Sequence, residues 1–109
     1  MKFADGSSYE GQFISNNIQG EGRYTWPDSR TYQGEWLNNK MHGHGCFSFE
    51  DGKIYLGFFA NDRKNGLGCL KQKDGTSYNG FWKNDLQHGK GVILDQVGKV
   101  LVKGEWREV

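Results

Sequence analysis

The sequence predicts an all-β protein, a continuous antiparallel meander of β-hairpin repeats that together form one thin sheet. Three observations support this fold class: a repeat of 23 residues, strand-like alternation within each copy, and turn-forming residues between the alternating stretches. The composition agrees, because aromatic residues reach 15% and there are 17 glycines but one proline. A compact core needs aliphatic side chains in two facing layers. Large rings spaced by glycine instead fit a sheet in which flat rings lie over bare backbone.

Five sequence columns recur in register along the chain. The first column holds tyrosine, at Tyr9, Tyr32, Tyr55 and Tyr78. Glycine follows two residues later and Phe or Trp two residues after that. A Gly-x-Gly pair recurs in phase, at Gly20/Gly22, Gly43/Gly45, Gly66/Gly68 and Gly89/Gly91. An Asp-Gly step precedes most tyrosines, at Asp5-Gly6, Asp51-Gly52 and Asp74-Gly75, with Asp28-Ser29 in the same phase.

Each period predicts two strands and two turns. Tyr-x-Gly-x-Trp/Phe alternates with period two, and so does Gly22-x-Tyr24-x-Trp26. Between them lie Ser/Asn/Asp pairs such as Asn38-Asn39, which tolerate left-handed backbone and can bond their own main chain. The Asp-Gly steps form the other turn. We expect eight or nine strands of roughly five residues, in repeats spanning 9–31, 32–54, 55–77 and 78–101, and no helix.

The aromatic columns point to one face of this ribbon and form its structural spine. The glycines leave room for neighbouring rings to lie flat on the backbone, so the fold itself explains why the rings are present. A stacking site for sugars or bases is therefore disfavoured. The predicted spine consists of Tyr9, Phe13, Tyr32, Trp36, Tyr55, Phe59, Tyr78, Trp82 and Trp106.

The end of the chain departs from this register. Gly104 and Trp106 repeat the Gly-x-Trp step, but Val102 stands where tyrosine is expected. The interval from Gly80 to Gly104 is 24 residues, and Gly98 lacks the preceding aspartate. We interpret residues 102–106 as a degenerate terminal strand that pairs near residues 91–96 and ends the array.

The motif set resembles the MORN (membrane occupation and recognition nexus) repeat over essentially the whole chain. The second copy is the closest, in Tyr32-Gln33-Gly34-Glu35-Trp36, His42-Gly43-His44-Gly45 and Asp51-Gly52. The first and third copies depart mildly, with Phe13 and Phe59 in place of Trp and with Gln19 and Asn65 in place of His.

The resemblance implies an elongated, twisted, single-layer sheet with a groove along one side. Arrays similar to this one hold cytoskeletal, ciliary or membrane-associated complexes together. Some grip a helix or peptide in the groove, some dimerise end to end, and some have been linked to phosphoinositides. Others sit beside catalytic domains, so a regulatory appendage of a catalytic domain absent from this chain stays open.

The alternate strand positions, on the opposite face, change character along the chain. They are polar in the first copy, at Glu10, Gln12, Glu21 and Arg23, and mixed in the second. They are apolar in the third copy and continue so in the fourth, although Asn79, Lys83 and Lys90 interrupt the run there. A contiguous apolar patch on a single-layer sheet marks an interface, which a partner protein, a second copy or a segment of a longer parent protein could cover. We therefore expect Phe58 and Leu67 to be exposed. The predicted partner-binding residues are Leu37, Leu56, Phe58, Leu67, Cys69, Phe81, Val92 and Leu94.

Charge is unevenly distributed. The net charge of +1 gives no reason to expect a nucleic-acid partner. Residues 1–52 hold four Lys/Arg and seven Asp/Glu, whereas residues 53–109 hold ten and six. The alternative ligand is an anionic phospholipid surface, contacted through Arg63, Lys64, Lys71 and Lys73.

The sequence offers little support for catalysis, a metal or a cofactor. His42, His44 and Cys46 alternate along one strand, but no fourth zinc ligand is evident. Cys46 and Cys69 lie one repeat apart, about 9–10 Å, which is beyond disulfide reach. Free thiols suit a reducing, cytoplasmic setting. No Ser or Cys has the neighbouring base that nucleophilic catalysis needs.

The leading hypothesis is a non-enzymatic scaffold that binds a protein, peptide or helix.

Overall fold

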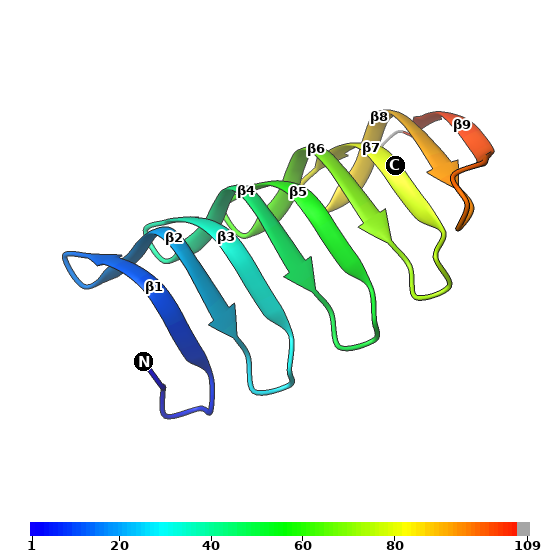
Figure 1. The fold of residues 1–109 in the computed structure, drawn as a ribbon. Coiled ribbons are helices and arrows are strands. Elements are labelled where there is room, and N and C mark those ends of the chain that lie inside the picture. Colours follow the sequence, from blue (N-terminus) through cyan, green and yellow to red (C-terminus); the bar gives the residue numbers. More distant parts are fainter. Residues whose placement is uncertain (107–109) are drawn as a thin grey trace.

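The computed structural model describes residues 1–106 and places them in one antiparallel sheet whose nine strands follow chain order (Figure 1). The described residues contain no helix. The strands are β1 (Ser8–Ile14), β2 (Asn17–Thr25), β3 (Thr31–Leu37), β4 (Lys40–Ser48), β5 (Ile54–Ala60), β6 (Arg63–Lys71), β7 (Ser77–Lys83), β8 (Leu86–Leu94) and β9 (Val100–Trp106). Strands of seven and nine residues alternate in the first eight. They exceed the expected five because pairing continues beyond the aromatic motif into each turn.

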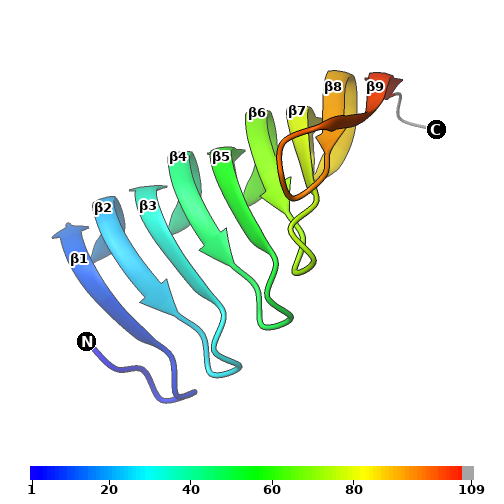
Figure 2. The ribbon, with the colours of Figure 1, turned by 45° about the vertical axis from the view of Figure 1, so that its right-hand side comes forward.

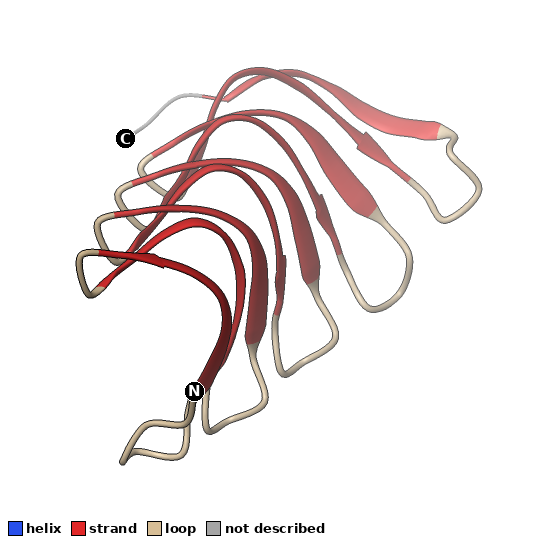
Figure 3. Cartoon of the chain, turned by 60° about the vertical axis from the view of Figure 1, so that its left-hand side comes forward, coloured by secondary structure: helices blue, strands red, loops and turns tan. Residues whose placement is uncertain are grey.

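The sheet forms an elongated arch with extents of 44 × 24 × 23 Å. The hairpins follow one another along the long axis, with β1 and β9 at opposite ends (Figures 1 and 2). Every strand bends, so the sheet has a concave inner face and a convex outer face (Figure 3). A β-bulge in each hairpin contributes to the bend, for example between Gly57 and Phe59 of β5.

Both predicted kinds of turn are confirmed. At the turn between β3 and β4, Asn38 and Asn39 have φ angles of 48° and 68°, as a two-residue hairpin turn with positive φ at both positions requires. At the opposite edge Gly52 has a φ angle of 93°. Ser29, which replaces glycine in this column, is held at a φ angle of 80°.

In three of the Asn/Asp turns the second residue links neighbouring repeats rather than bonding its own main chain. Such side chains were expected to bond their own main chain. Instead, a side-chain oxygen accepts a hydrogen bond from the backbone amide of a strand in the preceding repeat. The pairs are Asn39 with Ile18, Asp62 with Met41 and Asp85 with Lys64, at 2.7–2.8 Å. The turn side chain thus supplies an acceptor to an amide at the hairpin edge, which ties each repeat to the next.

The core is a row of interlocked rings on the inner face. The four tyrosines of the repeat are 0–4% exposed. Tyr32 meets Trp36 of its own repeat edge-on at 5.0 Å and Phe59 of the next repeat at 5.1 Å. Tyr55 repeats the arrangement with Phe59 and Trp82. Edge-to-face contacts of this kind stabilise the fold by more than the buried area alone would give. We call this row of ring contacts the ring zipper. It joins neighbouring repeats although the sheet has no second layer.

Of the residues predicted to form the spine, all are buried except Phe13 and the half-buried Trp106. Phe13 contacts Tyr9 at 4.9 Å, but its side chain remains 41% exposed because no tyrosine of a preceding repeat covers its other side. At the other end Trp106 packs edge-on against Tyr78 at 5.0 Å. The terminal strand is longer than expected, since β9 begins at Val100, and its Gly104 pairs with Gly91.

Candidate interaction surface

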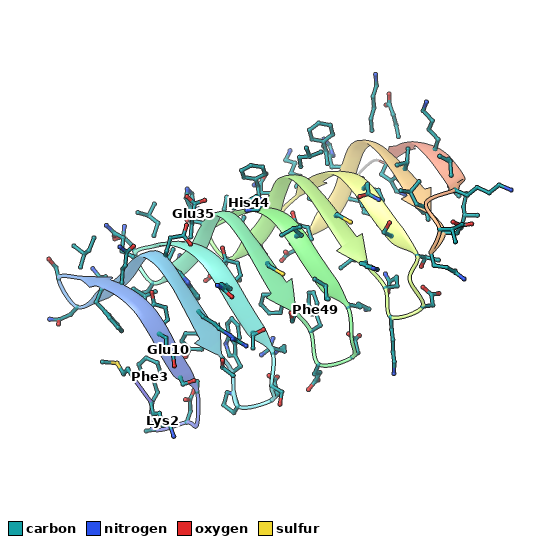
Figure 4. The ribbon with its side chains drawn as sticks, in the orientation of Figure 1. Lys2, Phe3, Glu10, Glu35, His44 and Phe49 are labelled. Carbon is teal, nitrogen blue, oxygen red and sulfur yellow. The ribbon has the colours of Figure 1, made fainter. Side chains whose placement is uncertain are left out.

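Two rows of side chains run along the outer face, perpendicular to the strands. Between them lies a row of glycines, which we call the glycine lane and which includes Gly57, Gly68, Gly80 and Gly91. Figure 4 shows Glu35 and His44 on the outside of the arch, at its crest. The glycines between the rows pair across the sheet and would direct a Cβ inward, against the tyrosine rings. One row holds Glu35, His44, Phe58, Leu67, Phe81, Lys90 and Glu105. The other holds Gln33, Cys46, Leu56, Cys69, Asn79, Val92 and Lys103.

The rows are polar in repeat 1, mainly polar in repeat 2 and apolar in repeat 3, and in repeat 4 they combine Phe81 and Val92 with the polar Asn79 and Lys90. Phe58 is 44% exposed and Leu67 is 55% exposed, as the sequence predicted for both. His44 extends the apolar region toward repeat 2 by packing edge-on against Phe58 at 5.4 Å. We call the following residues the outer apolar patch: Leu56, Phe58, Leu67, Cys69, Phe81 and Val92.

Two adjoining hollows indent this patch. One, of about 400 Å³, lies among Leu56, Phe58 and Leu67. The other, of about 480 Å³, lies among Leu67, Phe81 and Val92 and extends toward β9. Both arise because the glycine lane leaves no side chain between the rows. The structure thus brings together six of the eight predicted partner-binding residues, while Leu37 and Leu94 line neither hollow.

A third hollow, of about 360 Å³, lies on the inner face between repeats 2 and 3. Its apolar walls are Trp26, Met41, Phe47, Phe49 and Phe59, and its polar groups are Arg30, Asp62, Lys64 and Asp85. The inner groove implied by the sequence resemblance therefore has aromatic walls and an ion pair between Lys64 and Asp85.

Lys64 is the unusual member of this inner hollow. Its side chain is only 16% exposed, and its Nζ lies 3.8 Å from a carboxylate oxygen of Asp85. The ammonium also lies 5.3 Å from the centre of the Trp82 ring and 5.5 Å from that of Phe49. Burial lowers the pKa of Lys64, and Asp85 opposes that effect.

The four cations predicted to contact lipid do not form one patch. Lys64 points into the inner hollow, whereas Arg63 is exposed at the start of β6 and Lys71 at its other end. These two cations therefore lie at opposite ends of the nine-residue strand. Sequence reasoning missed the inward orientation of Lys64, although its column also contains the apolar residues Ile18 and Met41, which are buried.

The described residues give few starting points for other chemistry. Cys46 and Cys69 are free thiols, and burial raises the pKa of both, so both are poor nucleophiles at neutral pH. Within residues 1–106, no group of three His, Cys, Asp or Glu side chains could hold a metal ion. No helix in the described part of the chain is long and apolar enough to cross a membrane.

Comparison with known proteins places the repeat in a family. No curated protein matches the chain significantly. A family model of the MORN repeat matches four times, at residues 9–29, 32–54, 55–77 and 78–99, which together make up most of the chain. These matches coincide with the four hairpin units, and MORN repeats mediate interactions with proteins or membranes. The chain therefore belongs to the MORN repeat family.

Proposed function

We propose that this chain is a non-enzymatic protein-interaction scaffold whose partner docks on the outer apolar patch. The observation that carries the proposal is the change along the outer face, where Phe58 and Phe81 occupy the column that holds Gln12 and Glu35 in repeats 1 and 2. The backbone and the inner ring zipper are alike in all four repeats, so the fold does not require exposed phenylalanines there. Large exposed apolar side chains gathered over hollows are typical of a binding surface.

A protein partner fits this surface better than a membrane does. The cations closest to the patch, Lys90 and Lys103, stand in rows that also contain acidic or neutral residues such as Glu105 and Asn79. The four lysine and arginine residues of the lipid alternative are dispersed over the edges and the inner hollow. Apolar docking between proteins depends weakly on salt, whereas binding to anionic lipid falls steeply with ionic strength.

The test is capture from a cell lysate with the wild-type chain and with a Phe58→Gln/Phe81→Gln variant. Any protein retained selectively by the wild type is then purified, and its affinity for both chains is measured by calorimetry. We expect the variant to bind at least about tenfold more weakly, because two exposed aromatic anchors are lost. A Glu10→Ala/Gln33→Ala variant, altered on the outer face of repeats 1 and 2, is the matched control and should bind normally.

Two outcomes would contradict the proposal. Equal affinity of the wild type and the Phe58→Gln/Phe81→Gln variant would exclude the outer apolar patch and direct attention to the inner groove. Salt-sensitive sedimentation with phosphatidylcholine vesicles that contain phosphatidylserine, together with loss of that binding in an Arg63→Ala/Lys71→Ala variant, would favour the lipid alternative.

A further inference from the structure

The β-bulge of each hairpin separates one backbone amide from its usual ladder partner. In repeat 3 three residues of β6 lie opposite Phe58 alone. The Phe58 carbonyl accepts a hydrogen bond from the Tyr55 hydroxyl at 3.0 Å and is thus directed toward that ring. The backbone polar groups of Leu67 face β5 at this point, because the Leu67 carbonyl oxygen lies beside Gly57. The register shift displaces the Leu67 amide from the regular ladder position opposite Phe58.

Repeats 1 and 2 supply this acceptor from a side chain. Oε1 of Gln12 accepts a hydrogen bond from the Glu21 amide at 2.7 Å. Oε2 of Glu35 accepts one from the His44 amide in the same way. The Gln12 and Glu35 carbonyls accept from Tyr9 and Tyr32, as the Phe58 carbonyl does from Tyr55. An amide or carboxylate oxygen on the outer face is thus the natural acceptor for the amide at the bulge.

Repeats 3 and 4 lack that acceptor because phenylalanine occupies the column. Within residues 1–106 no side chain accepts a hydrogen bond from the amide of Leu67 or of Lys90, the equivalents of Glu21. Leu67 and Lys90 are both exposed. The amides of Leu67 and Lys90, one beside Phe58 and one beside Phe81, thus lack the side-chain acceptor that Gln12 and Glu35 provide in repeats 1 and 2.

We propose that the partner is an acidic amphipathic helix that lies along the array and uses glutamate side chains to accept hydrogen bonds from these two amides. This inference rests on the proposed function. Leu67 and Lys90 lie on β6 and β8, two strand spacings or about 9.6 Å apart. Seven residues of α-helix rise about 10.5 Å, so glutamates seven residues apart reach both amides. An extended peptide presents side chains of one face about every 6.8 Å and does not match.

Charge on the outer face favours the acidic helix and places it over repeats 3 and 4. The polar end of the array presents Glu10, Glu21 and Glu35 with the single cation Arg23 among them, whereas the far end presents Lys83, Lys90 and Lys103 with the single carboxylate Glu105. An acidic helix is repelled by the first group and attracted by the second. Apolar residues three and four positions after the first glutamate then face the patch between the two amides.

The first experiment measures these amides in the free protein by ¹H–¹⁵N NMR. We expect the Leu67 and Lys90 amides to exchange with solvent faster than the Glu21 and His44 amides, which are hydrogen-bonded to side chains. Equal protection of all four amides would overturn the inference at once, because repeats 3 and 4 would then have no free donor. It would leave the proposed docking of a protein on the apolar patch intact.

The second experiment uses a designed peptide helix with two glutamates seven residues apart on its leucine face. On binding, the amide protons of Leu67 and Lys90 should move downfield. A peptide with lysine in place of both glutamates should bind at least about tenfold more weakly, since each hydrogen bond to a charged group contributes that factor or more. Failure of the glutamate peptide to bind, or binding that leaves both amide signals unmoved, would overturn the inference.

The Phe58→Gln/Phe81→Gln variant makes repeats 3 and 4 like repeat 1. Its new side chains should accept from the Leu67 and Lys90 amides, so both become protected, the unfolding temperature does not fall, and the peptide binds at least about tenfold more weakly. The Phe58→Ala/Phe81→Ala variant loses the rings but gains no acceptor. At saturating peptide, the amide protons of Leu67 and Lys90 should therefore still move downfield in this variant. Wild-type affinity of the glutamine variant would contradict the proposed hydrogen bonds.

Discussion

Repeats 1 and 2 and repeats 3 and 4 share one inner face but present different outer faces. The tyrosine of every repeat is buried and donates to the carbonyl three residues later, at 2.9–3.0 Å. On the outer face, by contrast, Gln12 and Glu35 give way to Phe58 and Phe81. The difference teaches that packing and hydrogen bonds fix the inner columns, whereas the fold accepts either a hydrogen-bonding side chain or a phenylalanine in this outer column. Variation at free positions is where a specific interaction can be encoded.

The largest expected effect comes from breaking the ring zipper in its middle. Phe59 is 5% exposed and contacts the tyrosines of two repeats, whereas Phe13 in the same column contacts one. Phe59→Ala should therefore lower the free energy of unfolding by about 3–5 kcal/mol. Phe13→Ala should cost about half as much. Urea denaturation monitored by tyrosine and tryptophan fluorescence measures both, and equal losses would refute the zipper as the link between repeats.

Substitutions of the glycines between the two outer rows give the next largest effect, and the cost depends on which glycine is replaced. A Cβ at Gly68 would collide with the Tyr55 hydroxyl, whereas one at Gly104 would meet nothing within 4 Å. Gly68→Ala should cost about 3 kcal/mol, because the buried ring has no free space into which it can move. Gly22→Ala should cost about the same, since repeat 1 has the same inner face. If Gly22→Ala lowered the free energy of unfolding much less than Gly68→Ala does, the inner faces of repeats 1 and 3 would not be equivalent.

The hydrogen bonds that link neighbouring repeats at the Asn/Asp turns are expected to contribute less to the free energy of unfolding than the ring contacts and the glycines do. Asp62→Ala removes the acceptor for the Met41 amide and should lower the free energy of unfolding by about 1 kcal/mol. Asp62→Asn should be close to neutral, because Asn39 makes the equivalent bond to Ile18 with its amide oxygen. Thermal unfolding of both variants tests this, and a loss in Asp62→Asn as large as in Asp62→Ala would indicate that charge matters rather than the hydrogen bond.

The sequence alone predicted the repeat period, both kinds of turn, the strand order and the exposure of Phe58 and Leu67, because each depends on local alternation or on residues that favour positive φ. It did not predict which face is concave or that Lys64 points inward. Both depend on the bulge, which shifts the register between Gly57 and Phe59 and leaves no mark in a pattern of period two. The acceptor role of Gln12 is likewise visible only once the bulge has displaced the Glu21 amide.

The smallest expected effect on stability comes from Lys64. It lies on the inner face of repeat 3, in the column that holds the apolar residues Ile18 and Met41 in repeats 1 and 2. Lys64 occupies the column of Met41, so Lys64→Met fits the shape of the inner hollow. The substitution removes the cost of burying an ammonium and also removes its contacts with Asp85 and the rings. Buried ion pairs are often neutral or unfavourable relative to apolar replacements. We therefore expect Lys64→Met to raise the free energy of unfolding at neutral pH by up to about 1 kcal/mol.

The pH dependence of the stability of Lys64→Met distinguishes the cost of burying the ammonium from the benefit of its contact with Asp85. Burial lowers the pKa of Lys64, so the unfolded chain binds the proton more tightly than the folded chain does. Wild-type stability therefore rises as pH increases from the folded-state pKa to the unfolded value of 10.5. The advantage of Lys64→Met should be constant below this window and shrink across it, while the tyrosines contribute equally to both proteins. If the wild type is instead more stable than the variant at neutral pH, the contacts of Lys64 with Asp85, Phe49 and Trp82 outweigh its burial, and the inner hollow stabilises a cation.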